Sequence, residues 1–222
     1  MQNLDYFFII QAWPLFLKGL WVTLYLTFWA NVAGLIGGAL LALCTTGPYR
    51  LLSAPAKLYI EFFRCTPALV QIVWFFFCVP ILFDVFWSPI FMGVVILGMN
   101  LSAFNAEAFR AAIQTIPRAH VDAAVALGLT PFERTAYVIM PQALRYAIPV
   151  LITNGIGLFQ QTSLVALVGV DELMYNGRLI STSTYRPIET YTFLVLFYLA
   201  VSIPIGRLAA FIEARSDRAL KA

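Results

Sequence analysis

Five apolar stretches, each long enough to cross a lipid bilayer, dominate this chain. A membrane-spanning helix needs about 20 mostly apolar residues. Stretches of that kind occupy residues 19–43, 58–79, 88–109, 146–170 and 190–212. Only 11% of the 222 residues are charged and 61% are hydrophobic, whereas a soluble domain carries about 25% charged residues. The sequence therefore predicts an all-α integral membrane protein, a single domain (residues 1–222) with five transmembrane helices.

The distribution of Lys and Arg predicts the orientation of these spans. Ten of the 14 basic residues lie after spans one and three, at the end of span five or in the tail, three lie on the other side, and Arg64 lies inside span two. Cytoplasmic segments of membrane proteins are enriched in Lys and Arg. We therefore expect the N-terminus outside and the C-terminus in the cytoplasm, as an odd number of spans requires. The net charge of +3 gives no indication of a nucleic-acid partner.

The cysteines and the histidine indicate neither disulfides nor a metal site. Cys44, Cys65 and Cys78 lie in or beside apolar runs and form no C-x-x-C pair. His120 is the only histidine and cannot hold a metal ion alone. Metal ligands are therefore predicted to be absent.

A compact folded element is predicted in the polar segment between spans three and four, residues 117–141. Pro117 suits the first turn of a helix, good helix formers follow it, and Gly128 suits a helix stop. Thr130 then begins a Thr-Pro-Phe-Glu sequence, which is typical of a capping box at the start of a second helix. An ordinary solvated loop is the alternative, but a plain connector of about 4–6 residues needs no capped helices. The pattern favours a surface that docks another protein.

This segment resembles the EAA loop of the permease subunits of ABC importers, which reads Glu-Ala-Ala, three residues, Gly, nine residues and Ile-x-Leu-Pro. The corresponding residues here are Asp122-Ala123-Ala124, Gly128 and Val138-Ile139-Met140-Pro141. Asp replaces Glu, Val replaces Ile and Met replaces Leu, but the spacing is intact. Four more stretches are similar to the polar amino-acid branch of that family: FRCTPALVQ at 63–71, AEAFR at 106–110, PQALR at 141–145 and TSL at 162–164.

The resemblance implies a mechanism, partners and a location. In such importers a coupling helix in this loop sits in a groove of a cytoplasmic ATPase dimer. A second permease chain, identical or related, completes the path through the lipid, and an external substrate-binding protein delivers the amino acid. The location implied is a bacterial inner membrane. The ATPase-coupling candidates are His120, Asp122, Ala123, Ala124, Leu127, Gly128 and Pro131.

The chemistry of ATP is expected in the partner. The chain has no G-x-x-x-x-G-K-[ST] phosphate loop. We therefore expect that this chain is not an enzyme and holds no cofactor. ATP and Mg are expected to bind to the ATPase subunit.

Polar side chains inside the spans are candidates for a substrate site, because they are costly in lipid and usually face protein or a water-filled path. Span four carries the most polar run, between Asn154 and Ser163. Many members of the branch have Lys-Asp-Thr-Ser-Leu where this chain has Gln-Gln-Thr-Ser-Leu, so the identity of the amino acid stays open. Hydrogen bonding between helices alone is the alternative. The substrate-binding candidates are Thr66, Glu107, Asn154, Gln160, Gln161, Thr162 and Ser163.

Charged residues inside spans two and three allow several interpretations. Glu61 and Arg64 are about one helical turn apart, so an ion pair between them is predicted; Arg64 contacting an anionic substrate group is the alternative. Glu107 is either a partner for a substrate ammonium group or a counter-charge for Arg64 or Arg110.

Two further features concern packing and the outer side. Gly34, Gly37 and Gly38 predict a close packing face on span one. The segment 170–187 reads as a solvated outer loop, and the resemblance implies that it contacts the substrate-binding protein.

Three classes of protein remain as hypotheses. The permease subunit of an ABC importer for polar amino acids is the first. An ion-coupled secondary amino-acid transporter is the second, although such proteins often show internal repeats and none is evident here. A membrane scaffold protein is the third. This hypothesis explains the docking segment but not the polar run in span four.

Overall fold

The structure, a computed structural model, describes residues 7–46 and 50–221, and every regular element in that part is a helix. Element η1 is a π-helical turn, η2 is a 3₁₀ helix, and the others are α-helices. In chain order the elements are α1 (Phe7–Gln11), α2 (Trp13–Thr46), α3 (Arg50–Cys65), α4 (Ala68–Phe83), α5 (Pro89–Thr115), α6 (Arg118–Ala126), α7 (Pro131–Glu133), η1 (Arg134–Ile139), α8 (Met140–Gln161), η2 (Thr162–Val168), α9 (Leu173–Thr184) and α10 (Pro187–Lys221).

Four helical stretches are long and apolar enough to cross a membrane. They are Trp13–Thr46, Pro89–Thr115, Pro131–Val168 and Pro187–Ile212. A fifth crossing is available if α3 and α4 together count as one span. The predicted all-helical membrane fold is thereby confirmed, with four to five candidate spans.

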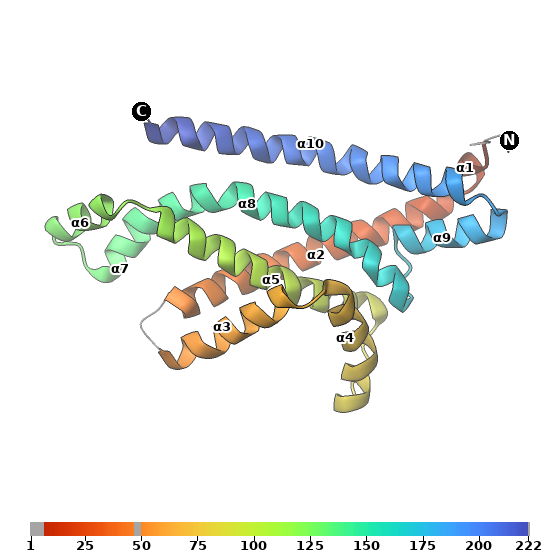
Figure 1. Cartoon of the computed structure of the whole chain (residues 1–222), viewed down its shortest axis with the longest axis horizontal. Helices are drawn as coiled ribbons and strands as arrows, with labels where there is room; N and C mark the ends of the chain where they lie inside the picture. The colour runs from red at the N-terminus through yellow and green to blue at the C-terminus, as the bar shows by residue number, and fades with distance from the viewer. Residues whose placement is uncertain (1–6, 47–49, 222) are drawn as a thin grey trace.

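The second predicted span, residues 58–79, is wrong as a continuous helix. The helices Leu51–Cys65 and Ala68–Phe83 meet at a bend of 109°. Pro67 lies at this bend, and proline has no N–H to donate and disfavours helical backbone in the residue before it. As a result α4 points away from the other long helices (Figure 1). Apolar residues lie on both sides of the bend, which is why the apolar pattern alone did not reveal it.

Glycines allow α2 and α5 to approach closely, and these two helices form the most extensive helix pair in the fold. A Cβ atom at Gly34 would lie 2.6 Å from Leu101 Cδ2, and one at Gly38 would lie 2.6 Å from Asn105 Cβ. Both distances are too short for any other residue to fit without displacement. The packing face predicted on the first span is therefore confirmed.

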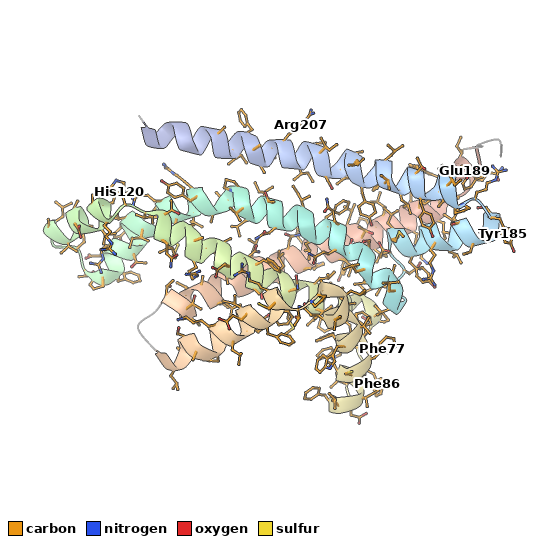
Figure 2. The ribbon with its side chains drawn as sticks, in the orientation of Figure 1. Phe77, Phe86, His120, Tyr185, Glu189 and Arg207 are labelled. Carbon is orange, nitrogen blue, oxygen red and sulfur yellow. The ribbon has the colours of Figure 1, made fainter. Side chains whose placement is uncertain are left out.

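The long helices lie side by side along one axis and separate two ends of the molecule (Figure 1). One end holds α6, α7 and the C-terminal part of α10, and the opposite end holds α1 and α9. His120 and Tyr185 mark these two ends in Figure 2. The candidate site residues are distributed between them.

Candidate functional site

The element predicted at 117–141 begins with α6, which ends in a well-defined stop. Gly128 takes a positive φ of 75°, a conformation that suits glycine. The N–H of Gly128 donates to the carbonyl of Val125 at 2.9 Å, and the N–H of Leu129 donates to the carbonyl of Ala124 at 3.1 Å. This pair of bonds is a Schellman motif, and the predicted helix stop is confirmed.

A capping box starts the next helical segment, also as predicted. Thr130 Oγ1 accepts from the N–H of Glu133 at 3.3 Å, and Glu133 Oε2 accepts from the N–H of Thr130 at 2.9 Å. Pro131 fills the first helical position, where its missing N–H is no loss. Two caps therefore hold a tight turn between α6 and α7.

A π-helical turn connects this cap to α8. The N–H of Met140 donates to the carbonyl of Thr135, five residues back instead of four. Pro141 follows directly and cannot donate the next bond of an α-helix. His120 Nδ1 lies 2.8 Å from Gln142 Oε1, so a side-chain hydrogen bond connects α6 to the base of α8.

Large apolar side chains are exposed on this element, which lies outside the packed helices. Leu127 and Phe132 are each 79% exposed and Tyr137 is 72% exposed. Exposed apolar groups of this kind mark contact surfaces. We call Val125, Leu127, Phe132 and Tyr137 the apolar tip.

The coupling candidates lie mostly on the surface. Ala124 is the exception, because it is buried with 3% exposure. The exposed candidates are His120, Asp122, Ala123, Leu127, Gly128 and Pro131.

Arg64 pairs with Glu107 on α5, and the predicted Glu61–Arg64 ion pair is wrong. Arg64 Nη1 lies 3.7 Å from Glu107 Oε2, and Arg110 Nε donates to the same carboxylate at 3.0 Å. Glu61 has no ion-pair partner among the described residues. The guanidinium of Arg64 points toward α5 and lies 5.9 Å from the ring centre of Phe104. Sequence spacing along α3 could not reveal this contact between helices.

These charged groups line a polar pocket of about 220 Å³ between α3 and α5, near the end of α2. Its lining residues are Thr45, Lys57, Ile60, Glu61, Arg64, Glu107 and Arg110. Because Glu107 already binds two arginines, its charge is balanced within the protein.

A second polar pocket, of about 150 Å³, lies between α5 and α8. We call it the amide pocket, because three of its lining residues carry side-chain amides and none is charged. Asn154 Nδ2 donates to Asn105 Oδ1 at 3.1 Å. Gln161 Oε1 is buried and has no hydrogen-bond partner within the described part of the chain. The lining residues are Asn100, Leu101, Phe104, Thr153, Asn154, Gly157, Leu158 and Gln161.

The other substrate candidates of span four lie elsewhere. Gln160 and Ser163 line a groove of about 380 Å³ against α10, where Gln160 Nε2 donates to Ser202 Oγ at 3.4 Å. Thr162 is fully buried and donates to the carbonyl of Phe159 at 2.7 Å. The helix changes from α to 3₁₀ at Thr162, so the residues that follow lie on other faces than α-helical spacing predicts. The sequence pattern did not reveal this change.

Thr66 stabilises the bend between α3 and α4, and Gln71 makes buried polar contacts there that the sequence analysis missed. Thr66 Oγ1 donates to the carbonyl of Phe62 at 2.7 Å and accepts from Gln71 Nε2 at 2.6 Å. Gln71 Oε1 accepts from Asn100 Nδ2 at 2.8 Å, so Gln71 connects the bend to the amide pocket. The available signal was an amide inside an apolar run, four residues after a proline.

The prediction of a solvated loop at 170–187 is wrong, because most of this segment is the helix α9. Asp171 forms an ion pair with Lys18. Glu172 is fully buried and caps α9 by accepting from the N–H of Tyr175 at 2.7 Å. Burial raises the pKa of Glu172 above its ordinary value.

The family of the chain follows from comparison with known proteins. Residues 34–218 match the family described as "Binding-protein-dependent transport system inner membrane component", and the chain belongs to this family. The predicted resemblance to importer permeases is thereby confirmed. The chain is a multi-pass inner-membrane permease subunit and not itself an enzyme.

Several relatives match over nearly their whole length. The "Probable amino-acid permease protein YxeN" of Bacillus subtilis (strain 168) is 34% identical over 205 residues, which are 91% of this chain and 92% of the relative. The "Glutamine transport system permease protein GlnP" of Escherichia coli (strain K12) is 32% identical over 221 residues, 99% of each chain. The "Glutamate/aspartate import permease protein GltK" of Escherichia coli O157:H7 is 31% identical over 223 residues, 97% of this chain and 100% of the relative.

Solved structures agree with the fold. A chain from the "Crystal structure of an amino acid ABC transporter with histidines" superimposes with a TM-score of 0.90 at 31% identity, covering 96% of this chain and all of that one. A chain of an inward-facing MetNI methionine ABC transporter superimposes with a TM-score of 0.67 at 23% identity, covering 93% of this chain and 95% of that one. The second likeness concerns the fold alone.

Proposed function

We propose that this chain is the membrane-spanning subunit of an ATP-driven importer that carries a polar amino acid into the cytoplasm by alternating access. The relatives that match over nearly their whole length are named for amino acids, among them glutamine and glutamate/aspartate. The observation that supports the mechanism best is the apolar tip, a firmly capped and exposed apolar surface outside the packed helices.

The apolar tip is the proposed docking surface for a cytoplasmic ATPase dimer, which binds ATP and Mg. Leu127 and Phe132 are exposed enough to enter a groove of another protein. The Schellman motif, the capping box and the bond between His120 and Gln142 make the element stiff. A stiff element can transmit closure of the ATPase dimer to α5 and α8, which flank it in the chain.

The amide pocket is the proposed contact site for the amino acid. Amides donate and accept hydrogen bonds, so they suit the polar groups of an amino acid. The pocket, at about 150 Å³, is smaller than a usual ligand pocket of about 300–1,000 Å³. This supports a path completed by a second permease chain, identical or related.

The opposite end of the molecule, with α1 and α9, is proposed to face outward toward the substrate-binding protein. The N-terminus is then outside and the C-terminus cytoplasmic. The pairing of Asp171 with Lys18 and the burial of Glu172 leave other residues of this end, such as the exposed Tyr185, to make that contact.

Affinity purification from the native host tests the docking proposal. We compare the wild-type chain, Leu127→Glu, and Tyr185→Ser as a control that changes a strongly exposed residue at the other end. Mass spectrometry should identify an ATPase with a phosphate loop in the wild-type and control samples. Leu127→Glu should lose it, because a carboxylate is costly in an apolar groove.

The outcomes separate the parts of the proposal. An ATPase that is retained by Leu127→Glu contradicts docking through the apolar tip. An ATPase that is absent from every folded sample contradicts the importer itself. ATP-dependent uptake of labelled glutamine, glutamate and aspartate by proteoliposomes holding the purified complex then tests the substrate class.

A further inference from the structure

We propose that Gln71 is a positioning residue that sets the polarity of the amide pocket. It orients Asn100 so that the pocket presents oxygen acceptors, which bind a donor group of the substrate, a primary amide or an ammonium, in preference to a carboxylate. This inference rests on the proposed role of the amide pocket.

The orientation of the Gln71 amide is determined by its neighbours. Gln71 Nε2 lies 2.9 Å from the carbonyl oxygen of Phe63 and 3.0 Å from that of Thr66. A backbone carbonyl oxygen can only accept a hydrogen bond. The reverse orientation would place the oxygen of Gln71 against two other oxygens in a buried position. The nitrogen must therefore face the bend between α3 and α4.

The orientation of Asn100 follows from that of Gln71. The remaining atom of the Gln71 amide, Oε1, is an acceptor and lies 2.8 Å from Asn100 Nδ2. Asn100 must present its nitrogen there, which leaves its oxygen for the amide pocket that it lines. No donor to Asn100 Oδ1 is found within the described residues.

The other amides of the pocket are consistent with this polarity. Gln161 Oε1 is a buried acceptor without a partner in the described part of the chain, and Asn154 uses its nitrogen to donate to Asn105. The acceptors left for an occupant of the pocket are therefore oxygens, Asn100 Oδ1 first among them. A donor group satisfies them, whereas a carboxylate would leave them unpaired and face them with its own charge.

The test is direct binding of labelled glutamine to the detergent-solubilised complex of permease and ATPase, with no substrate-binding protein present. Glutamate, which replaces the side-chain amide by a carboxylate, and the 2-hydroxy analogue of glutamine, which lacks the ammonium group, serve as competitors. We expect at least one of them to bind about tenfold more weakly than glutamine, a ratio typical of one lost hydrogen bond in a buried site. The competitor that does so identifies the donor group.

Gln71→Met should reduce the ratio of the competitor's dissociation constant to that of glutamine to about one. Asn100 is then free to turn its nitrogen into the pocket. Asn100→Ser, which leaves the bend intact, should reduce it as well, because a hydroxyl both donates and accepts. Tyr59→Phe is the matched control. The Tyr59 hydroxyl also bonds α3 to α5, through the carbonyl of Met99 at 3.0 Å, but it does not line the amide pocket. The ratio should stay at the wild-type value in this variant.

The outcomes distinguish this inference from the proposed function. The positioning role is overturned if Gln71→Met weakens the binding of all three ligands equally. It is also overturned if the affinity ratios are unchanged in both Gln71→Met and Asn100→Ser. In either case the pocket assignment stands. Wild-type complex that binds no glutamine, or whose binding is unaffected by Asn154→Leu, overturns the pocket assignment and with it this inference.

Discussion

At the residue scale, Gly38 allows α2 and α5 to pack closely because glycine has no side chain. A Cβ there would lie 2.6 Å from that of Asn105. Asn105 in turn accepts a hydrogen bond from Asn154 of the amide pocket. The close approach of α2 to α5 thus supports the helix that faces the pocket.

Gly38→Val should destabilise the protein by about 1–3 kcal/mol, the usual cost of overpacking a tight contact. Gly206→Val is the control, since both glycines lie inside helices and the nearest atom to a Cβ at Gly206 is 3.9 Å away. Unfolding in detergent measures the free-energy difference. Equal destabilisation of the two variants would contradict the packing role of Gly38.

Glu172 should make stability depend on pH. Burial raises the pKa of its carboxyl above the ordinary 4.5, so the folded state favours the protonated form. The stabilisation linked to this proton is fully present below pH 4.5 and is lost as pH rises through the folded pKa. Wild type should therefore lose stability relative to Glu172→Gln as pH rises from about 4.5, as measured by thermal unfolding of both proteins across pH. A stability difference between the two proteins that does not change with pH would contradict the raised pKa of Glu172.

At the element scale, the turn between α6 and α7 depends on backbone conformation more than on space. Gly128 has a φ of 75°, yet nothing lies within 4 Å of a Cβ built there. A substitution at this position acts through strain and not through a clash. Asparagine tolerates the left-handed conformation, whereas a β-branched residue does not.

Gly128→Val should uncouple ATP hydrolysis from transport, and Gly128→Asn should stay close to wild type. Strain of about 1–2 kcal/mol would loosen the end of α6 and its alignment with the ATPase. The measurement is the number of ATP molecules hydrolysed per amino acid imported in proteoliposomes, compared for the three proteins. Uncoupling by both variants alike would point to the exposed surface at Gly128 and not to its conformation.

The contact between α3 and α5 should appear as an energetic coupling between Arg64 and Glu107. Their closest atoms are 3.7 Å apart and both side chains are partly exposed, so a double-mutant cycle with Gln at each position should give about 0.5–1 kcal/mol. The parallel cycle of Arg64 with Glu61 should be additive. Coupling in the second cycle and none in the first would restore the pairing predicted from spacing.

Features encoded within a few residues could be predicted from the sequence, and features that depend on contacts between elements could not. The stop at Gly128 and the cap at Thr130 follow from local backbone chemistry and were both predicted correctly. The partner of Arg64 depends on how α3 packs against α5, and the importance of Gln71 depends on a bond to a helix 29 residues away. The apolar pattern located four of the five predicted spans, because burial in lipid requires apolar residues in any topology.

At the scale of the whole molecule, the arrangement of the two ends restricts how the chain can sit in a bilayer. The apolar tip and α9 lie at opposite ends of the long axis (Figures 1 and 2). One candidate span, Pro131–Val168, connects them. A single crossing places its two ends on opposite sides of the membrane. Docking of a cytoplasmic ATPase at the apolar tip, as proposed above, then requires α6 in the cytoplasm and α9 outside.

Cysteine labelling should reveal this orientation. In a background where Cys44, Cys65 and Cys78 are replaced by Ala, we introduce Leu127→Cys or Tyr185→Cys, at positions 79% and 88% exposed. A membrane-impermeant thiol reagent added to spheroplasts should modify Tyr185→Cys at once, and Leu127→Cys only after permeabilisation. The cysteine-free background controls for non-specific labelling. Modification of both from outside would show that Pro131–Val168 does not cross the membrane. The reverse pattern would place the apolar tip outside, where no ATPase that uses cytoplasmic ATP could bind it.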